Sequence, residues 1–246
     1  MNSEVSNLLL EIAHCPNVQK CYGLSTKYHP CSSIVSTQNV TLDAFHLPEP
    51  WNGEIGTAPI LFISSNPSIN INEIYPTKSW DDQQVIDNFN NRFGGFWVKV
   101  QKNRYHPKLV NGSYAKANPY WGKVRNHAEK ILQREVIAGK DFAITEVVHC
   151  KSVDEIGVKN AISECIKYLP RILAIAGASV IVVVGKKSEP MIKAFLGLPN
   201  SKSRFIKAEN RYWVFVDHSY TKYVLLENVL SASELALIRS TVQAHR

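Results

Sequence analysis

The sequence lacks any apolar run near the roughly 20 residues that a membrane-spanning helix needs. Its first residues, Met1 to Glu4, lack the basic start of a signal peptide, and Leu8 to Leu10 are too few for its apolar segment. We therefore expect a cytoplasmic protein without a membrane partner.

No glycine-rich phosphate loop follows any predicted strand, which disfavours a phosphate-binding α/β enzyme.

Acidic residues are scarce: 21 Asp and Glu face 28 Lys and Arg, a formal net charge of +7. This excess favours a polyanionic partner, nucleic acid first. Residues 99–127 contain seven Lys or Arg, no Asp or Glu, and the aromatic residues Tyr105, Tyr114, Tyr120 and Trp121. Such a stretch suits phosphates and unstacked bases, although a solvated basic face is the simpler interpretation.

Four short apolar runs predict buried strands, and helical patterns alternate with them. The predicted strands are residues 60–64, 142–148, 180–185 and 212–216. The predicted helices are residues 4–13, part of 81–99, 118–133, 155–176, 188–196 and 224–244. The alternation predicts a three-layer αβα sandwich around a central, mostly parallel four-stranded sheet. We expect one domain over residues 1–246, with a cysteine-bearing N-terminal segment and a basic insertion around 99–127.

Polar residues follow each predicted strand, and in a parallel sheet these ends share one edge, where ligands bind. Ser65 and Asn66-Pro67 follow the first strand, and Glu146 lies in the second. Lys186-Lys187 follow the third, and Asp217-His218-Ser219 follow the fourth.

These features, in this order, make the chain similar to the uracil-DNA glycosylase superfamily. Its first motif ends a strand in Asp, Asn or Glu followed by Pro, and its second motif is a His-containing loop after the last strand. The resemblance implies a DNA glycosylase, in which Asn66 orients the water and His218 donates a hydrogen bond to O2 of the leaving base. Because the second motif's proline is missing after His218, Asp217 is the alternative for that position.

The resemblance also implies residues that bind the flipped base and the DNA. Ser65 and Phe93 would contact the base, with Phe93 stacking on it and Phe96 and Trp121 as alternatives. Ser219, Tyr220 and Lys222, in the second-motif loop, would contact DNA, with Tyr220 or Tyr223 filling the vacated stack. Lys186 and Lys187 would add phosphate contacts.

Glu146 departs from the pattern, because uracil-specific relatives have Asn at this position. An ionised Glu only accepts hydrogen bonds, so it suits the exocyclic amino group of cytosine better than O4 of uracil. We therefore expect a preference for cytosine or 5-substituted cytosine. A protonated Glu146 would also serve uracil, and a carboxylate paired with Lys151 or His149 is the structural alternative.

The five cysteines are unlikely to form disulfides in a cytoplasmic protein. In iron-sulfur branches of the superfamily, cysteines occur at positions that resemble Cys15, Cys21, Cys150 and Cys165, with Cys31 able to replace Cys15 or Cys21. Four thiolates from distant segments suit a 4Fe-4S cluster. The same four thiolates could instead hold zinc. The alternative without any metal is that all five cysteines are ordinary buried thiols.

Together these expectations describe a monomeric, monofunctional DNA glycosylase that releases a base without cutting the strand. Because removing ordinary cytosine would harm the host, restriction of phage DNA with modified cytosine is a possible setting. The alternatives are a uracil-DNA glycosylase in base excision repair and a non-catalytic nucleic-acid binding module.

Overall fold

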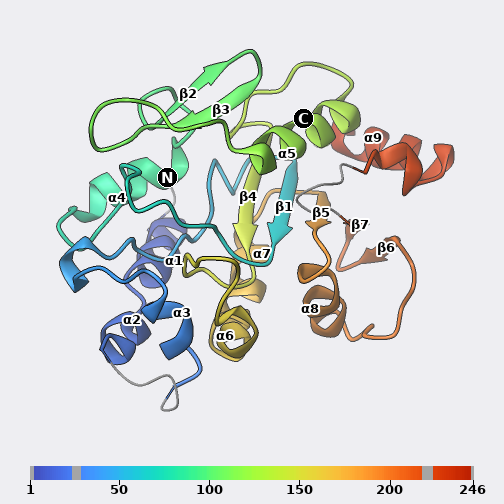
Figure 1. Ribbon diagram of the computed structural model, residues 1–246. Helices are drawn as coiled ribbons and strands as arrows, with labels where there is room; N and C mark the ends of the chain where they lie inside the picture. Colours follow the sequence, from blue (N-terminus) through green and yellow to red (C-terminus); the bar gives the residue numbers. More distant parts are fainter. Residues whose placement is uncertain (1–2, 24–28, 218–223, 245–246) are drawn as a thin grey trace.

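The computed structural model describes residues 3–23, 29–217 and 224–244, and a five-stranded sheet lies at its centre (Figure 1). The strand order is β4-β1-β5-β7-β6, in which the first four are parallel and β6 is antiparallel to β7. The bounds are Ile60–Ser64 for β1, Phe142–Glu146 for β4, Val180–Val184 for β5, Phe205–Ala208 for β6 and Arg211–Val216 for β7. The mostly parallel sheet is confirmed, with β6 as a strand beyond the four predicted.

Helices cover both faces of the sheet, because successive residues of each apolar strand point to opposite sides. Leu61 and Ile63 face α1, α4, α7 and α8, whereas Ile60 and Phe62 face α5 and α9. These helices span Ser3–Ala13 (α1), Asp82–Asn90 (α4), Pro119–Leu132 (α5), Leu169–Ile175 (α7), Ser188–Phe195 (α8) and Ala232–Ala244 (α9). The predicted three-layer αβα sandwich is therefore confirmed.

Local signals in the sequence set several helix ends. Asp81 caps α4 through a capping box with Gln84, and Asn118 caps α5 ahead of Pro119. The predicted helix 155–176 is divided into α6 (Val158–Cys165), a 3-10 turn (Ile166–Tyr168) and α7, with Pro170 in the first turn of α7. The predicted helix 224–244 begins only at Ala232, after a 3-10 turn at Leu226–Asn228.

A β-hairpin occupies part of the region in which helix was predicted up to about residue 99. Helix α4 ends at Asn90, and β2 (Val98–Gln101) then pairs with β3 (Arg104–Pro107). Lys102 and Asn103 form the two-residue turn, both with positive φ, as the turn of a tight hairpin requires. Neither residue is glycine, so the turn cannot be recognised from its two residues alone.

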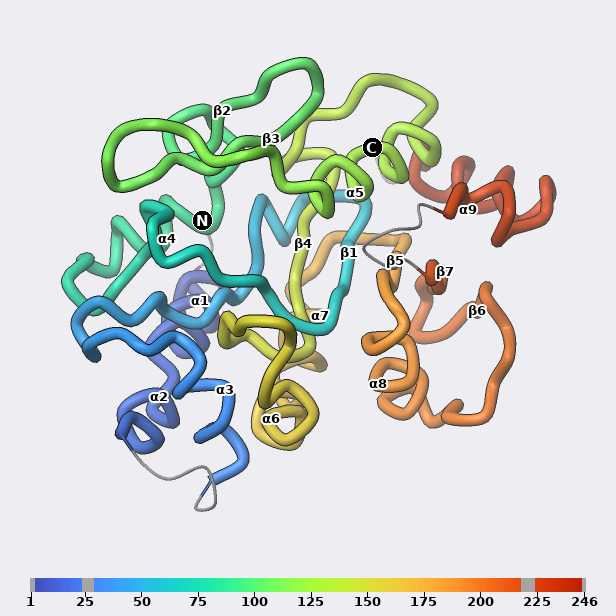
Figure 2. The backbone as a smooth tube through the Cα atoms, viewed as in Figure 1, coloured from blue at the N-terminus to red at the C-terminus, as the bar shows by residue number. Residues whose placement is uncertain are grey.

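The N-terminal segment packs beside a distant part of the chain. Helix α3 (Ser32–Ser36) lies between α2 (Pro16–Cys21) and α6, as Figure 2 shows. A 3-10 turn (Leu42–Ala44) then leads toward β1. None of the helices in the described ranges is both long and apolar enough to cross a membrane.

The contact between α3 and the start of α6 depends on Gly157, which has φ +79°. A Cβ there would lie 2.4 Å from the backbone nitrogen of Ile34. We predict that Gly157→Ala lowers the free energy of unfolding by about 2 to 4 kcal/mol, because backbone strain and overpacking add. Gly197→Ala is the matched control, since Gly197 has φ +73° but open space around it, and should cost about 1 kcal/mol. Equal urea midpoints for the two variants would contradict this packing.

Candidate functional site

The ends of β1 and β4 lie side by side and carry the central residues of the site. Ser64 pairs in register with Glu146. The pairing continues past the strands, because the Val147 and Val148 N–H groups donate to the carbonyls of Ser64 and Ser65, each at 2.9 Å. The predicted neighbours Ser65, Asn66 and Glu146 are thus brought together at one edge of the sheet.

The side-chain amide of Asn66 is held in one orientation. Its Nδ2 lies 2.8 Å from Ser152 Oγ, 3.3 Å from the Cys150 carbonyl and 3.0 Å from the Pro67 carbonyl. Its Oδ1 accepts no hydrogen bond from any residue that the structure describes. Asn66 is only half-buried, so this fixed acceptor is available to a water molecule.

Ser65 belongs to a chain of contacts that connects three strand ends. Its hydroxyl donates to Glu155, and Glu155 also forms an ion pair with Lys187. Ser65 follows β1, Glu155 lies in the loop after β4, and Lys187 follows β5. Glu155 therefore fixes the relative positions of the loops around Asn66. It also neutralises Lys187, which was predicted to contact phosphate.

Three buried polar side chains, those of Ser64, Tyr120 and Glu146, lie near one another, and they make few hydrogen bonds. Ser64 Oγ donates to Glu146 Oε1 at 3.4 Å, while Glu146 Oε2 has no hydrogen-bond partner within the described part of the chain. The Tyr120 hydroxyl, at the start of α5, is also buried and interacts with the Ser64 side chain, although it makes no hydrogen bond of good geometry within the described residues. Burial first, and then the nearby Glu146 carboxyl, raises the pKa of Tyr120 well above its ordinary value. Unsatisfied buried polar atoms cost free energy, so they favour a ligand or water here.

A buried network of charges lies next to Glu146. Arg92 pairs with Glu73 and lies 3.9 Å from Glu49, and Lys151 Nζ lies 3.6 Å from Glu49 and 3.9 Å from Glu73. The two cations therefore balance the two carboxylates. Lys151 pairs with these residues and not with Glu146, and His149 Nδ1 lies 2.9 Å from the Glu49 carbonyl. These contacts therefore argue against the alternative that Glu146 is paired with Lys151 or His149.

Glu146 is the one carboxyl of this group without a cation of its own. Burial raises the pKa of Glu146 well above the ordinary 4.5, and the nearby Glu49 carboxylate adds to the effect. The cations Lys151 and Arg92 oppose the shift without cancelling it. The favoured form is therefore the protonated acid, which has one donor and one acceptor. The sequence analysis had started from the ionised form.

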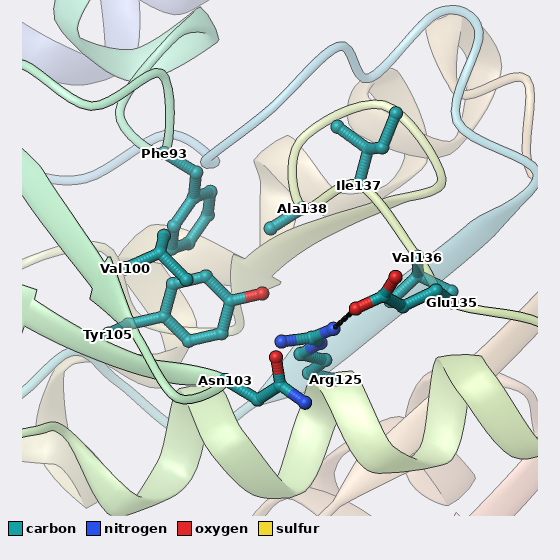
Figure 3. A pocket seen from close by; sticks show the side chains of 9 residues that line it. All are labelled: Phe93, Val100, Asn103, Tyr105, Arg125, Glu135, Val136, Ile137 and Ala138. Atoms are coloured by element: carbon teal, nitrogen blue, oxygen red, sulfur yellow. Dashed lines mark hydrogen bonds and ion pairs between the residues drawn. The ribbon is translucent and has the colours of Figure 1, made fainter.

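Phe93 lies apart from this group of residues. It packs edge-on against Tyr105 and Trp121 and lies 6.5 Å, centroid to centroid, from Phe142 at the start of β4. Glu146 ends the same strand, four residues or about 13 Å further on. Figure 3 shows Phe93 lining a cavity of about 280 Å³ with Tyr105, Arg125 and Glu135. The structure thus does not bring Phe93 together with Glu146 and Asn66, and Trp121 packs with it in the core.

The remaining residues predicted to contact DNA fall into two groups. Lys186 is largely exposed, with its Nζ 3.9 Å from Asp217 Oδ2. His218, Ser219, Tyr220 and Lys222, together with Tyr223, lie outside the described residues. Their predicted roles therefore stay predictions.

The five cysteines gather in one buried cluster between the N-terminal helices, the residues after β4, and α6. The cluster contains Cys21, Cys31, Cys150 and Cys165, with the half-buried Cys15 packed against it. Burial, followed by the neighbouring thiols, raises the pKa of Cys31 to about 12 and that of Cys150 well above its ordinary value. Burial also raises the pKa of Cys165 to about 11.

The surroundings of these sulfurs have some features of a thiolate site. Backbone N–H groups of Asn17 and Val18 interact with Cys15, and that of His149 interacts with Cys165. Asn17 Nδ2 lies 4.0 Å from Cys31 Sγ. However, among the residues that the structure describes, no three His, Cys, Asp or Glu side chains form a group that could hold a metal ion. The donor chemistry thus suits a metal cluster, but the sulfurs are not arranged as a coordination sphere.

Several residues of the site were not found from the sequence. Tyr120 was noted only as part of the basic stretch, and Glu49, Glu73, Arg92 and Glu155 were not singled out. Each stands in an irregular or polar segment, where periodicity gives no sign of burial. The only available signal was charge next to aromatic residues, as at Arg92-Phe93 and Glu73 to Tyr75.

The proton on Glu146 predicts a pH dependence of stability. Because the folded-state pKa is raised, the folded protein keeps a proton that the unfolded chain loses above about pH 4.5. Stability therefore falls as pH rises from 4.5 toward the folded pKa, by up to about 1.4 kcal/mol for each pH unit. Glu146→Gln, which cannot ionise, should gain stability relative to the wild type in urea unfolding as the pH rises from 5 toward the folded-state pKa of Glu146. A constant difference across this range would show that Glu146 is ionised in the fold.

Comparison of the sequence with protein-family models gives no match, and comparison with curated proteins gives no significant match. The function of the chain therefore has to be inferred from its own residues and contacts.

Proposed function

We propose that the chain is a monofunctional DNA glycosylase that flips a base out of DNA and hydrolyses its N-glycosidic bond. The observation that supports this most is that two polar side chains stand at the ends of neighbouring strands. The amide of Asn66 is fixed with its Oδ1 free, and the buried carboxyl of Glu146 has one oxygen without a hydrogen-bond partner in the described residues. One group suits a water molecule and the other suits a base edge. The resemblance to the uracil-DNA glycosylase superfamily supports the same division of roles.

In this proposal, the reaction breaks the bond between C1′ and the base nitrogen, and the bonding electrons leave with the base. His218 donates a hydrogen bond to O2 of the base, where negative charge develops. Asn66 Oδ1 holds a water molecule, whose oxygen bonds to C1′ while its proton is transferred to the departing base. Asn66 positions the water without acting as a strong base. The products are a free base and an abasic site, with the strand intact.

Glu146 is the proposed base reader. As a protonated acid it donates to N3 of cytosine and accepts from the N4 amino group, forming two parallel hydrogen bonds. The same acid serves N3–H and O4 of uracil when the proton is on the other oxygen, so uracil-DNA glycosylase is the alternative activity. The buried Tyr120 hydroxyl is a further contact for the base or its 5-substituent.

We place the enzyme in defence against phage DNA that contains modified cytosine, since a modification requirement would spare the host. A non-catalytic nucleic-acid binding module is the alternative of a different class. It would bind DNA without releasing any base, and substitution of Asn66 would not affect it.

We also propose that four of the clustered cysteines hold a 4Fe-4S cluster, with zinc as the alternative. Cys15, Cys21, Cys150 and Cys165 are the proposed ligands, and Cys31 is the alternative to Cys15 or to Cys21. The support is the gathering of five thiols from three distant segments, with N–H groups near two of the sulfurs. When bound, the cluster would cross-link the N-terminal helices to α6 and to the residues after β4.

The proposed activity predicts base release that depends on Asn66. Oligonucleotides carrying 5-modified cytosine should give free base, detected by chromatography, faster than those carrying ordinary cytosine or uracil. Asn66→Ala should slow release by about 100-fold or more, because the water loses its position. Ser68→Ala, in the same loop but exposed, should leave the rate unchanged.

Each outcome of this experiment distinguishes the alternatives. Release of uracil alone supports the uracil-DNA glycosylase, and release from ordinary cytosine as fast as from modified cytosine argues against the defence role. A nicked strand without alkali treatment argues against a monofunctional enzyme. DNA binding with no release from any oligonucleotide would support the binding module.

The proposed cluster predicts iron, sulfide and visible absorption in freshly purified protein. Cys165→Ser should lose all three, because the thiolate ligand is removed. The same measurement on Cys15→Ser, Cys21→Ser and Cys31→Ser identifies the thiol that is not a ligand, because the variant that lacks this thiol keeps its iron. Zinc without iron supports the alternative metal, and wild-type protein with neither metal contradicts the cofactor.

A further inference from the structure

The positive charge of the protein is concentrated in one stretch of the chain. Residues 99–127 contain seven Lys or Arg and no Asp or Glu, which matches the whole formal charge of +7. The other 21 basic residues equal the 21 acidic ones, so the remainder is formally neutral. A single charged region of this kind indicates where a polyanion would bind.

The fold turns much of this stretch into a small platform, made of residues 96–116. The β2–β3 hairpin forms one part, and its inner side is anchored by buried Val98 and Tyr105. The chain then folds back, because the Leu109 N–H donates to the Ser113 carbonyl and the Ala115 N–H donates to the Pro107 carbonyl, at 2.8 and 2.9 Å. Three segments thus lie next to one another.

The basic residues of the platform are available to a ligand. Lys99, Lys102, Arg104 and Lys116 are exposed and Lys108 is half-buried. Within the described part of the chain, none of these five forms an ion pair. Arg125, by contrast, is buried and paired with Glu129 and Glu135, as the ion pair to Glu135 in Figure 3 shows. The platform therefore presents unneutralised charge, while the core below it is balanced.

Two exposed aromatic rings accompany these cations. Phe96 is 60% exposed and lies 4.5 Å from Lys108 Nζ, and Tyr114 is 40% exposed and lies 5.7 Å from Lys99 Nζ. Exposed aromatic rings offer faces on which bases can stack. Rings beside cations suit a strand whose bases are unstacked, since phosphates contact the cations and bases stack on the rings. A duplex has no free base faces to offer.

The platform is joined to the loop that follows Asn66. The Ile74 N–H donates to the Lys108 carbonyl and the Val110 N–H donates to the Asn72 carbonyl, both at 2.9 Å. Leu109 also bridges to Glu73, a member of the buried charge network. A strand lying on the platform would thus border the candidate site.

From this placement we propose that the platform of residues 96–116 binds single-stranded DNA, with Lys99, Lys102, Arg104, Lys108 and Lys116 on phosphates and Phe96 and Tyr114 under bases. The proposal extends the proposed glycosylase by naming the form of DNA that it grips, and it rests on that function for the choice of DNA. It names a surface separate from the second-motif loop and from Lys186 and Lys187.

The test compares two charge reversals of equal size. The double variant Lys99→Glu/Arg104→Glu alters the platform, and Lys202→Glu/Lys207→Glu alters exposed lysines around β6 as the control. Fluorescence anisotropy with a labelled single strand and a duplex of equal length gives the affinity at several salt concentrations. The platform variant should bind the single strand at least 10-fold more weakly than the control variant. Its slope of log affinity against log salt should shrink by about 1.4, for two lost phosphate contacts.

Phe96→Ala tests the stacking contribution without changing charge. It should weaken single-strand binding about 5-fold or more and leave duplex binding unchanged, because only unpaired bases stack on the ring. Equal weakening by the platform and control reversals overturns the proposal, as does tighter binding of duplex than of single strand by the wild type.

The base-release assay separates this proposal from the proposed function. If no oligonucleotide releases a base but the platform reversal still selectively weakens single-strand binding, the glycosylase fails and the platform stands. If bases are released and the two reversals bind alike, the platform fails and the glycosylase stands.

Discussion

The structure of the site depends on a buried balance of charge. Glu49, Glu73, Arg92 and Lys151 come from four separate segments of the chain, and each is almost fully buried. Buried charges are tolerated only when paired, so the four segments have to meet in one arrangement. Glu146 lies beside this balanced set as an additional carboxyl, and its burial first, followed by the Glu49 carboxylate, raises its pKa well above the ordinary value. The recognition chemistry proposed for Glu146 therefore follows from its burial without a cation of its own.

Much of the fold could be predicted because its causes are local or periodic. The runs that begin at Ile60 and Val180 are apolar, as is typical of strands covered on both faces. The helix caps at Asp81 and Asn118 depend only on a few neighbouring residues. The closeness of Asn66 and Glu146 followed from a rule about parallel strands and needed no knowledge of side-chain packing. The structure adds the register, which places Ser64 opposite Glu146.

What could not be predicted depends on contacts between distant residues. The hairpin turn at Lys102-Asn103 uses positive φ without glycine, and β6 has the mixed pattern of an edge strand. Phe93 looked suitable for stacking because it is aromatic and follows the first motif, but tertiary packing buries it against Tyr105 and Trp121. Tyr120 was hidden within a basic stretch, and only the packing of α5 brings its hydroxyl beside Glu146.

Cys150 takes part in two regions of the molecule at once. Its thiol lies in the cysteine cluster, whereas its carbonyl accepts a hydrogen bond from the amide of Asn66 at 3.3 Å. A single residue thus connects the cysteine cluster to the edge of the sheet that carries Asn66. A substitution of Cys150 that moved its backbone would therefore change the position of the Asn66 amide as well as the packing of the cysteines.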